Sequence, residues 1–261
     1  MTRLKDKVSI ITGAGQGIGR ATARRFADEG AIVIVAEMNA AAADRTVGDV
    51  RAAGAAAQSF IGDLSTYAAA EALVEFAIAQ FGHLDVLVNN VGGATALKPY
   101  HEWDPDDIVA EMNRSILPTL WCCRAALPHM VARKYGRIVN VGADSARNGL
   151  WDRAPYNVGK GGVMALTTSI ARETAAFGIN CNCLSPGFTD TATDRLVERG
   201  IRTAQASEYL QRLNQMQMDI TPMSRPATSE EQAAAIAFLA SDDVGHITGQ
   251  VLSSSGGMNM Q

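Results

Sequence analysis

The sequence predicts an α/β fold in which one doubly wound, seven-stranded parallel sheet carries helices on both faces. Short apolar runs alternate with segments of helical periodicity along the whole chain. Most of these runs are apolar throughout, which is typical of strands buried on both faces of a parallel sheet. With 261 residues, no internal repeat and no Pro/Gly/Ser-rich linker, the chain suits one large domain, so we expect residues 1–261 to form a single unit.

Repeated strand, helix, strand units imply right-handed crossovers between neighbouring parallel strands. In the helix expected at residues 65–80, Ser65 can cap the N-terminus, while Leu73, Ala77 and Phe81 share one face. The seven strands are expected at Val8–Thr12, Ala31–Ala36, Ser59–Ile61, Val86–Asn89, Arg137–Val141, Ile179–Leu184 and Gln250–Ser253.

One connection, residues 188–228, is much longer than the others. It is polar, with apolar residues at roughly helical spacing. So long a connection in a compact domain is usually functional, and we expect a substrate lid. A helical decoration that only covers the sheet is the alternative.

Composition excludes several function classes. The net charge of −4 offers no basic surface for nucleic acid. Without a run of about 18 apolar residues or a signal-peptide core, we expect no membrane span and a cytoplasmic protein. Four scattered histidines predict no metal site. Cysteine spacings match neither zinc nor disulfide patterns, so we expect reduced, mostly buried thiols at Cys122, Cys123, Cys181 and Cys183.

A glycine-rich turn, residues 13–19 (GAGQGIG), follows the first expected strand and precedes a helix pattern. Glycines let a phosphate approach the backbone, and the free N–H groups at the helix start favour an anion. The next strand ends in Glu37, 18 residues after Gly19. A carboxylate at this position can accept hydrogen bonds from both ribose hydroxyls of an adenosine and would repel a 2′-phosphate. The pattern therefore predicts dinucleotide binding, with NAD rather than NADP. A glycine-rich turn without a ligand is the alternative.

A second motif, Tyr156-Asn-Val-Gly-Lys160, places a tyrosine and a lysine on one helix face. Oxidising a secondary alcohol needs a base near the hydroxyl while hydride leaves for the cofactor. A lysine ammonium and a positive nicotinamide ring both favour tyrosinate, so the pair predicts acid/base chemistry. Seen alone, it would equally suit a solvated helix face.

These motifs resemble the short-chain dehydrogenase/reductase family over essentially the whole chain. The glycines are spaced as Thr12-Gly-x-x-x-Gly17-x-Gly19, and Asn89-Asn90-Val-Gly92 looks like the family's Asn-Asn-Ala-Gly element. The resemblance implies a Rossmann-like, dinucleotide-binding catalytic domain that assembles as a homotetramer. The implied cofactor-binding residues are Thr12, Gly13, Gly15, Gln16, Gly17, Ile18, Gly19, Glu37, Asp63, Leu64, Asn90, Tyr156, Lys160, Pro186, Gly187, Thr189 and Thr191.

The resemblance also implies catalytic roles. Tyr156 is the acid/base, Lys160 holds the ribose and lowers the tyrosine pKa, and Asn113 positions a water in a proton relay. The family's serine, which donates to the substrate oxygen, follows its strand by two residues, and here that position is Ala143. Ser145, 11 residues before Tyr156, is the alternative if the loop is shifted. With Ala143 one donor is missing, so the chain is naturally impaired or adapted, or a serine was replaced.

Two sets of segments refine the expected substrate. Residues 89–93 and 113–130 resemble dehydrogenases that turn ring cis-dihydrodiol carboxylates into catechols. Residues 144–147, 160–162 and 247–257 look more like enzymes that oxidise 2-hydroxycyclohexanecarboxyl-CoA. Both are NAD-linked oxidations of a hydroxyl on a six-membered alicyclic ring, and that shared reaction is our prediction.

Several side chains are candidates for substrate contact. Arg147 and Arg153 flank the loop before Tyr156 and suit a carboxylate or CoA phosphate, although solvated surface arginines are the alternative. Met216, Met218 and Met223 suit either an apolar pocket or the core. Two other functions stay open: a 3-oxoacyl-thioester reductase, which would usually prefer NADPH, and a non-catalytic nucleotide-binding protein.

Overall fold

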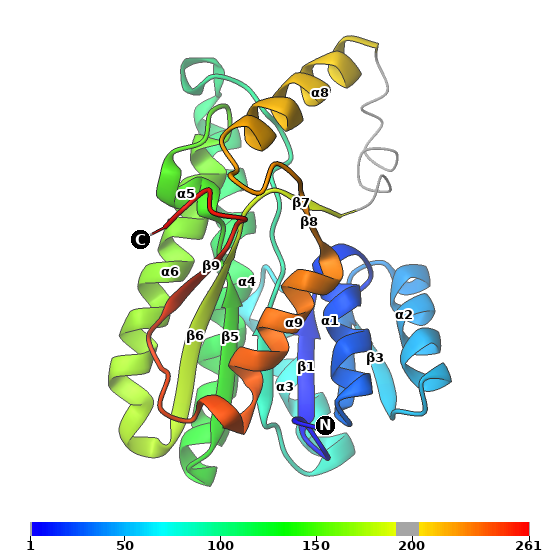
Figure 1. The fold of residues 1–261 in the computed structure, drawn as a ribbon. Coiled ribbons are helices and arrows are strands. Elements are labelled where there is room, and N and C mark those ends of the chain that lie inside the picture. The colour runs from blue at the N-terminus through cyan, green and yellow to red at the C-terminus, as the bar shows by residue number, and fades with distance from the viewer. Residues whose placement is uncertain (1, 192–203, 261) are drawn as a thin grey trace.

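The computed structural model describes residues 2–191 and 204–260, and side chains within them except those of 204–210. Its centre is a seven-stranded parallel sheet with the strand order β3-β2-β1-β4-β5-β6-β9 (Figure 1). The predicted fold class is confirmed. The strands are β1 Val8–Thr12, β2 Ile32–Glu37, β3 Ala57–Ile61, β4 Val86–Asn89, β5 Gly136–Val141, β6 Ile179–Pro186 and β9 Val251–Ser254.

Strand bounds differ from the predicted ones where pairing extends beyond the apolar run. β1 and β4 have the predicted bounds, whereas β3 begins at Ala57, which pairs with Val33. β6 continues to Pro186, which pairs with Ser254. Backbone pairing with a neighbour, which single-strand periodicity does not report, sets these ends.

Helices cover both faces of the sheet, as expected (Figure 1). Buried residues of α1, α2 and α9 pack against one face, and those of α3, α4 and α6 pack against the other. The α-helices are α1 Gly17–Asp28, α2 Ala40–Ala52, α3 Tyr67–Phe81, α4 Pro105–Arg133, α5 Asp144–Asn148, α6 Ala154–Thr174, α8 Ala204–Asp219 and α9 Ser229–Ala240. Short 3-10 turns are η1 Tyr100–Glu102, η2 Ala175–Phe177 and η3 Asp242–Val244.

The predicted cap of α3 is wrong by one residue. Thr66 is the N-cap, and its hydroxyl accepts from the Ala69 amide at 3.3 Å. The Ser65 carbonyl accepts from the indole of Trp121 on α4 at 3.1 Å, which ties the start of α3 to that helix. Of the predicted apolar face, Leu73 and Ala77 are fully buried.

The long connection contains regular elements in its described parts. β7 Thr189–Asp190 pairs in parallel with β8 Ala227–Thr228. Between them α8 lies beyond the carboxyl ends of the central strands (Figure 1). Residues 192–203 of the predicted lid lie outside the described residues.

All four cysteines are buried and form no disulfide. Burial raises the pKa of Cys122 and of Cys183 to about 12, so these thiols stay protonated near neutral pH. Their predicted burial is confirmed. In the described part of the chain, no helix is long and apolar enough to span a membrane.

Candidate active site

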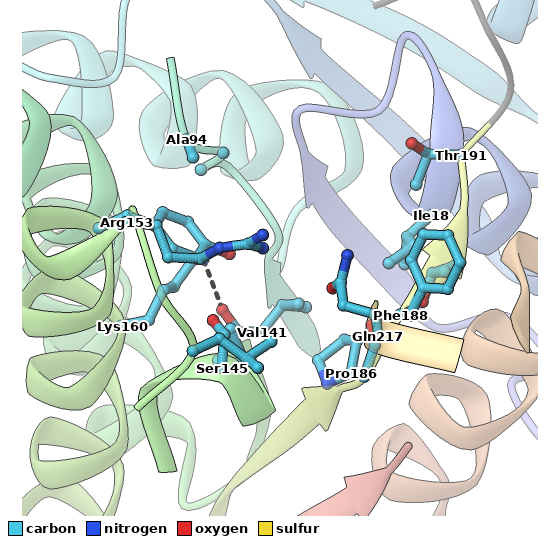
Figure 2. Close-up of a pocket in the computed structure, with 18 of the residues that line it drawn as sticks. Ile18, Ala94, Val141, Ser145, Arg153, Lys160, Pro186, Phe188, Thr191 and Gln217 are labelled. Carbon is cyan, nitrogen blue, oxygen red and sulfur yellow. Dashed lines mark hydrogen bonds between the residues drawn. The ribbon is translucent and has the colours of Figure 1, made fainter. Parts of the chain in front are cut away.

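The candidate site lies where the strand order of the sheet reverses, between the carboxyl ends of β1 and β4. A cavity of about 420 Å³ occupies this place (Figure 2). Its walls come from the loops after β4, β5 and β6, from α6 and α8, and from the C-terminal tail. Figure 2 shows Arg153 and Gln217 pointing toward each other across this cavity.

Two smaller cavities continue the first one toward the end of β2. One of about 200 Å³ shares Asn90, Gly92 and Gly93 with the first cavity. The other, of about 370 Å³, shares Gln16 and Glu37 with the 200 Å³ cavity. The three therefore form a continuous binding surface that suits an extended ligand.

The glycine-rich turn has no room for side chains. A Cβ on Gly19 would lie 2.2 Å from the Gly13 carbonyl oxygen, and one on Gly15 would lie 2.8 Å from a Glu37 carboxylate oxygen. Gly13 and Gly17 have φ angles of +61° and +51°, which glycine adopts most easily. Among the described residues no side chain caps the start of α1, so its first N–H groups are available to an anion.

Asn90 braces this turn from the neighbouring strand. Its amide nitrogen donates to the carbonyls of Thr12 and Gly13, at 3.1 Å each. The Thr12 hydroxyl oxygen in turn accepts from the Asn90 backbone N–H at 2.9 Å. These bonds keep the backbone of the turn in one conformation, close to the carboxyl end of β4.

Glu37 lies at the end of β2 with its carboxylate over the turn. One oxygen accepts from the Gly15 amide at 3.0 Å, and the other accepts from the Met38 and Asn39 amides at 2.9 and 3.2 Å. The group places a negative charge beside the uncapped start of α1. A dinucleotide fits this arrangement, because the turn can hold its phosphates while the carboxylate can accept hydrogen bonds from its ribose hydroxyls.

Tyr156 and Lys160 lie one turn apart on α6 and both line the large cavity. Lys160 is only 2% exposed, and its ammonium donates to the Val141 carbonyl at 2.7 Å and to the Val91 carbonyl at 3.4 Å (Figure 2). Gly92 makes room for it, since a Cβ there would lie 2.7 Å from the ammonium nitrogen. The predicted pair thus meets the predicted nucleotide residues in one cavity.

Ala143, which the strand count predicts at the family's serine position, stands at the start of α5 and lines this cavity, and that assignment stays a prediction. Ser145 lines the cavity too, but its hydroxyl donates to the Asn157 side-chain oxygen at 2.8 Å. A serine hydroxyl has a single proton. As placed, Ser145 therefore does not replace the donor that Ala143 lacks.

The remaining predicted site residues separate into three cases. Arg153 lines the large cavity. Arg147 is not among the residues lining it, and its guanidinium lies 3.6 Å from the buried Asp144 carboxylate, so its contact with substrate stays a prediction. Asn113 lies on α4, outside the residues lining the cavity, and its relay role stays a prediction.

Sequence reasoning missed part of the cavity wall. The three predicted methionines do not line it, and Met223 is 66% exposed. From α8 the lining residues are Leu213, Asn214 and Gln217, whose helical spacing was the signal that could have found them. Cavity-lining residues outside α8 that were not predicted include Gly93, Ala94, Leu97, Leu150 and Met258.

Comparisons with known proteins agree with this geometry. A family model described as short chain dehydrogenase matches residues 7–201. A 1,6-dihydroxycyclohexa-2,4-diene-1-carboxylate dehydrogenase of Acinetobacter baylyi is 43% identical over 98% of this chain and 97% of that protein. A cis-4-hydroxycyclohexanecarboxylate dehydrogenase of Sinomonas cyclohexanicum is 36% identical, over 97% and 96%. The solved structure of NAD+-bound xylitol dehydrogenase superimposes with a TM-score of 0.89 at 30% identity, covering 97% of this chain and 99% of that one.

Restoring a hydroxyl at position 143 should raise turnover. We expect Ala143→Ser to increase kcat by roughly tenfold or more, because one oxyanion-type donor is worth about 100- to 1000-fold elsewhere. Steady-state formation of the reduced nicotinamide cofactor measures the change. Ala146→Ser is the matched control, since Ala146 does not line the cavity. An unchanged rate in Ala143→Ser, together with loss of activity in Ser145→Ala, would contradict the assignment of Ala143 to the serine position.

Proposed function

Because this chain belongs to the short chain dehydrogenase family, whose members act on CH–OH groups, we propose that it uses NAD to oxidise a secondary alcohol on an alicyclic ring. One observation carries the proposal. Tyr156 and the buried Lys160 line a cavity that continues past the glycine-rich turn to Glu37. Acid/base and nucleotide-binding groups thus lie along one continuous surface.

Each residue has a role in this reaction. Tyr156 takes the proton of the substrate hydroxyl, and the positive charge of Lys160 favours the tyrosinate that does so. Lys160 also holds the ribose on the nicotinamide side. Glu37 accepts hydrogen bonds from the hydroxyls of the adenosine ribose. A nicotinamide bound beside Tyr156 would supply the hydride acceptor. The alcohol carbon thereby loses two electrons, and the product is a ketone.

The substrate class is supported by the cavity wall and by the relatives. Leu97, Leu150 and Leu213 give apolar contact for a ring, and Arg153 adds a positive group. The two relatives named above act, by their names, on six-membered rings that carry a hydroxyl and a carboxylate. We therefore propose a ring hydroxy acid, a dihydrodiol acid or a CoA thioester of either.

The proposal also covers domain organisation and assembly. Residues 1–261 act as a single catalytic domain, with the segment 188–228 as a substrate lid, because α8 contributes to the cavity wall. The unit is a homotetramer, in which α4 and α6 pack against a partner. Val109 and Val158, which are 50% and 60% exposed on these helices, support that packing.

Glu37 should set the nucleotide preference. We expect the wild type to use NAD at least about 100-fold more efficiently than NADP, because the carboxylate repels a 2′-phosphate. Glu37→Gln should lower this ratio by roughly tenfold, as measured by kcat/KM with each nucleotide. Glu75→Gln, an exposed change on α3, is the control. Tight NADPH binding with weak NADH binding would instead favour a reductase.

Arg153 should recognise the substrate carboxylate. We expect Arg153→Gln to raise KM for ring hydroxy acids by about 10- to 100-fold, the value of a lost charge-assisted hydrogen bond. The KM for the methyl esters of the same acids should change little. Arg212→Gln serves as the control, since Arg212 is exposed on α8 and does not line the cavity. Equal effects on acids and esters would contradict carboxylate pairing.

A further inference from the structure

Asp144 is a buried carboxylate that the proposed reaction does not use. Its side chain is fully buried at the start of α5, next to Ala143. One of its oxygens accepts from the hydroxyl of Ser185 on β6 at 2.5 Å, and the other accepts from the hydroxyl of Ser253 on β9. Because a buried charge is costly unless hydrogen bonds compensate it, these two donors tie α5 firmly to both strands.

From Ser253 a chain of hydrogen bonds continues into the C-terminal tail, residues 255–260. The hydroxyl oxygens of Ser253 and Ser255 lie 2.8 Å apart, and the Ser255 oxygen accepts from the Asn259 backbone N–H at 3.2 Å. Since Ser253 donates its single proton to the Asp144 carboxylate, Ser255 is the donor in the bond between the two serines. The carboxylate thus sets the direction of every bond in the chain, and bonds aligned in this way strengthen one another.

Met258 lies within this bonded tail and lines the large cavity. Its carbonyl accepts from the Asn148 side-chain amide at 3.3 Å, so the last residue of α5 braces the tail as well. Figure 1 shows the tail beside α5. It follows β9, which lies at one edge of the sheet, whereas Glu37 ends β2 near the opposite edge. Met258 therefore borders the part of the cavity that is remote from the nucleotide surface.

We propose that the C-terminal tail is a specificity-determining wall for the substrate, and that Asp144 is the positioning residue that holds it. Met258 supplies an unbranched apolar side chain that can follow the outline of a ring. The bonds through Ser253 and Ser255 fix its backbone before the substrate arrives, which reduces the ordering that binding requires. Asp144 is not among the residues lining the cavity and acts only through the tail. The inference rests on the proposed alcohol oxidation.

Ser253→Ala separates the tail from the carboxylate, while the Ser185 hydroxyl still donates to it. We expect the KM for a ring hydroxy acid to rise by about 3- to 10-fold, the effect of one hydrogen bond, with kcat and the NADH Kd changed by less than about twofold. Ser253→Thr keeps the hydroxyl and should retain the wild-type KM. Ser169→Ala is the matched control, because Ser169 is exposed on α6, where its hydroxyl donates to the Ala165 carbonyl.

Met258→Ala removes the proposed contact itself and should also raise this KM by about 3- to 10-fold, as expected for part of the apolar surface of a methionine. The double variant Ser253→Ala/Met258→Ala should be no worse than Met258→Ala alone, because the hydrogen-bond chain acts through the tail.

Two kinds of result contradict this account and are distinguishable. Unchanged KM values in both single variants, additive effects in the double variant, or an equal weakening of NADH binding in Ser253→Ala would overturn the inference and leave the proposed function standing. Inactivity of the wild type toward ring hydroxy acids with either nucleotide would contradict the proposed function and this inference with it.

Discussion

The site depends on a buried ammonium group. Lys160 lies almost fully out of water, and its charge is tolerated because the carbonyls of Val141 and Val91 accept hydrogen bonds from its ammonium group. Those carbonyls stand just where β5 and β4 end, so the sheet itself supplies the acceptors. Because Gly92 has no side chain, the lysine can reach them. Tyr156 then lies one turn away on the same helix, facing the cavity.

A polar ladder holds this helix against the sheet. The Asn89 amide donates to the Asn140 side-chain oxygen at 2.8 Å, and the Asn140 amide donates to the Thr167 hydroxyl at 2.9 Å. The ladder joins β4, β5 and α6 through side chains that are at most 1% exposed. The side chains of Asn140 and Thr167 are bonded, whereas the buried Asn89 side-chain oxygen has no partner among the described residues. Breaking either bond of the ladder would leave a further buried polar group without a partner. Helix and strand ends are thereby kept in register beneath the site.

Much of this was predictable from local sequence pattern. β1, which precedes the glycine-rich turn, and β4 are mostly apolar runs. The spacing of Tyr156 and Lys160 places both side chains on one face of a single helix. What local pattern did not predict involves contacts between elements. Thr66 rather than Ser65 caps α3, and the Ser65 carbonyl accepts from the indole of Trp121 on α4. The Arg147 guanidinium lies near Asp144, which also accepts from Ser185 on β6 at 2.5 Å. Met258 reaches the cavity through the folded tail, for which the sequence carries no local signal.

The central claim is that Tyr156 exchanges the substrate proton while the rest of the surface holds the nucleotide. Its most direct test is Tyr156→Phe, assayed in parallel for NADH formation from a ring hydroxy acid and for NADH binding by fluorescence titration. The account predicts a loss of turnover of at least about 100-fold, the usual contribution of a general base, with the NADH Kd changed by less than about threefold. Turnover close to that of the wild type would contradict the account.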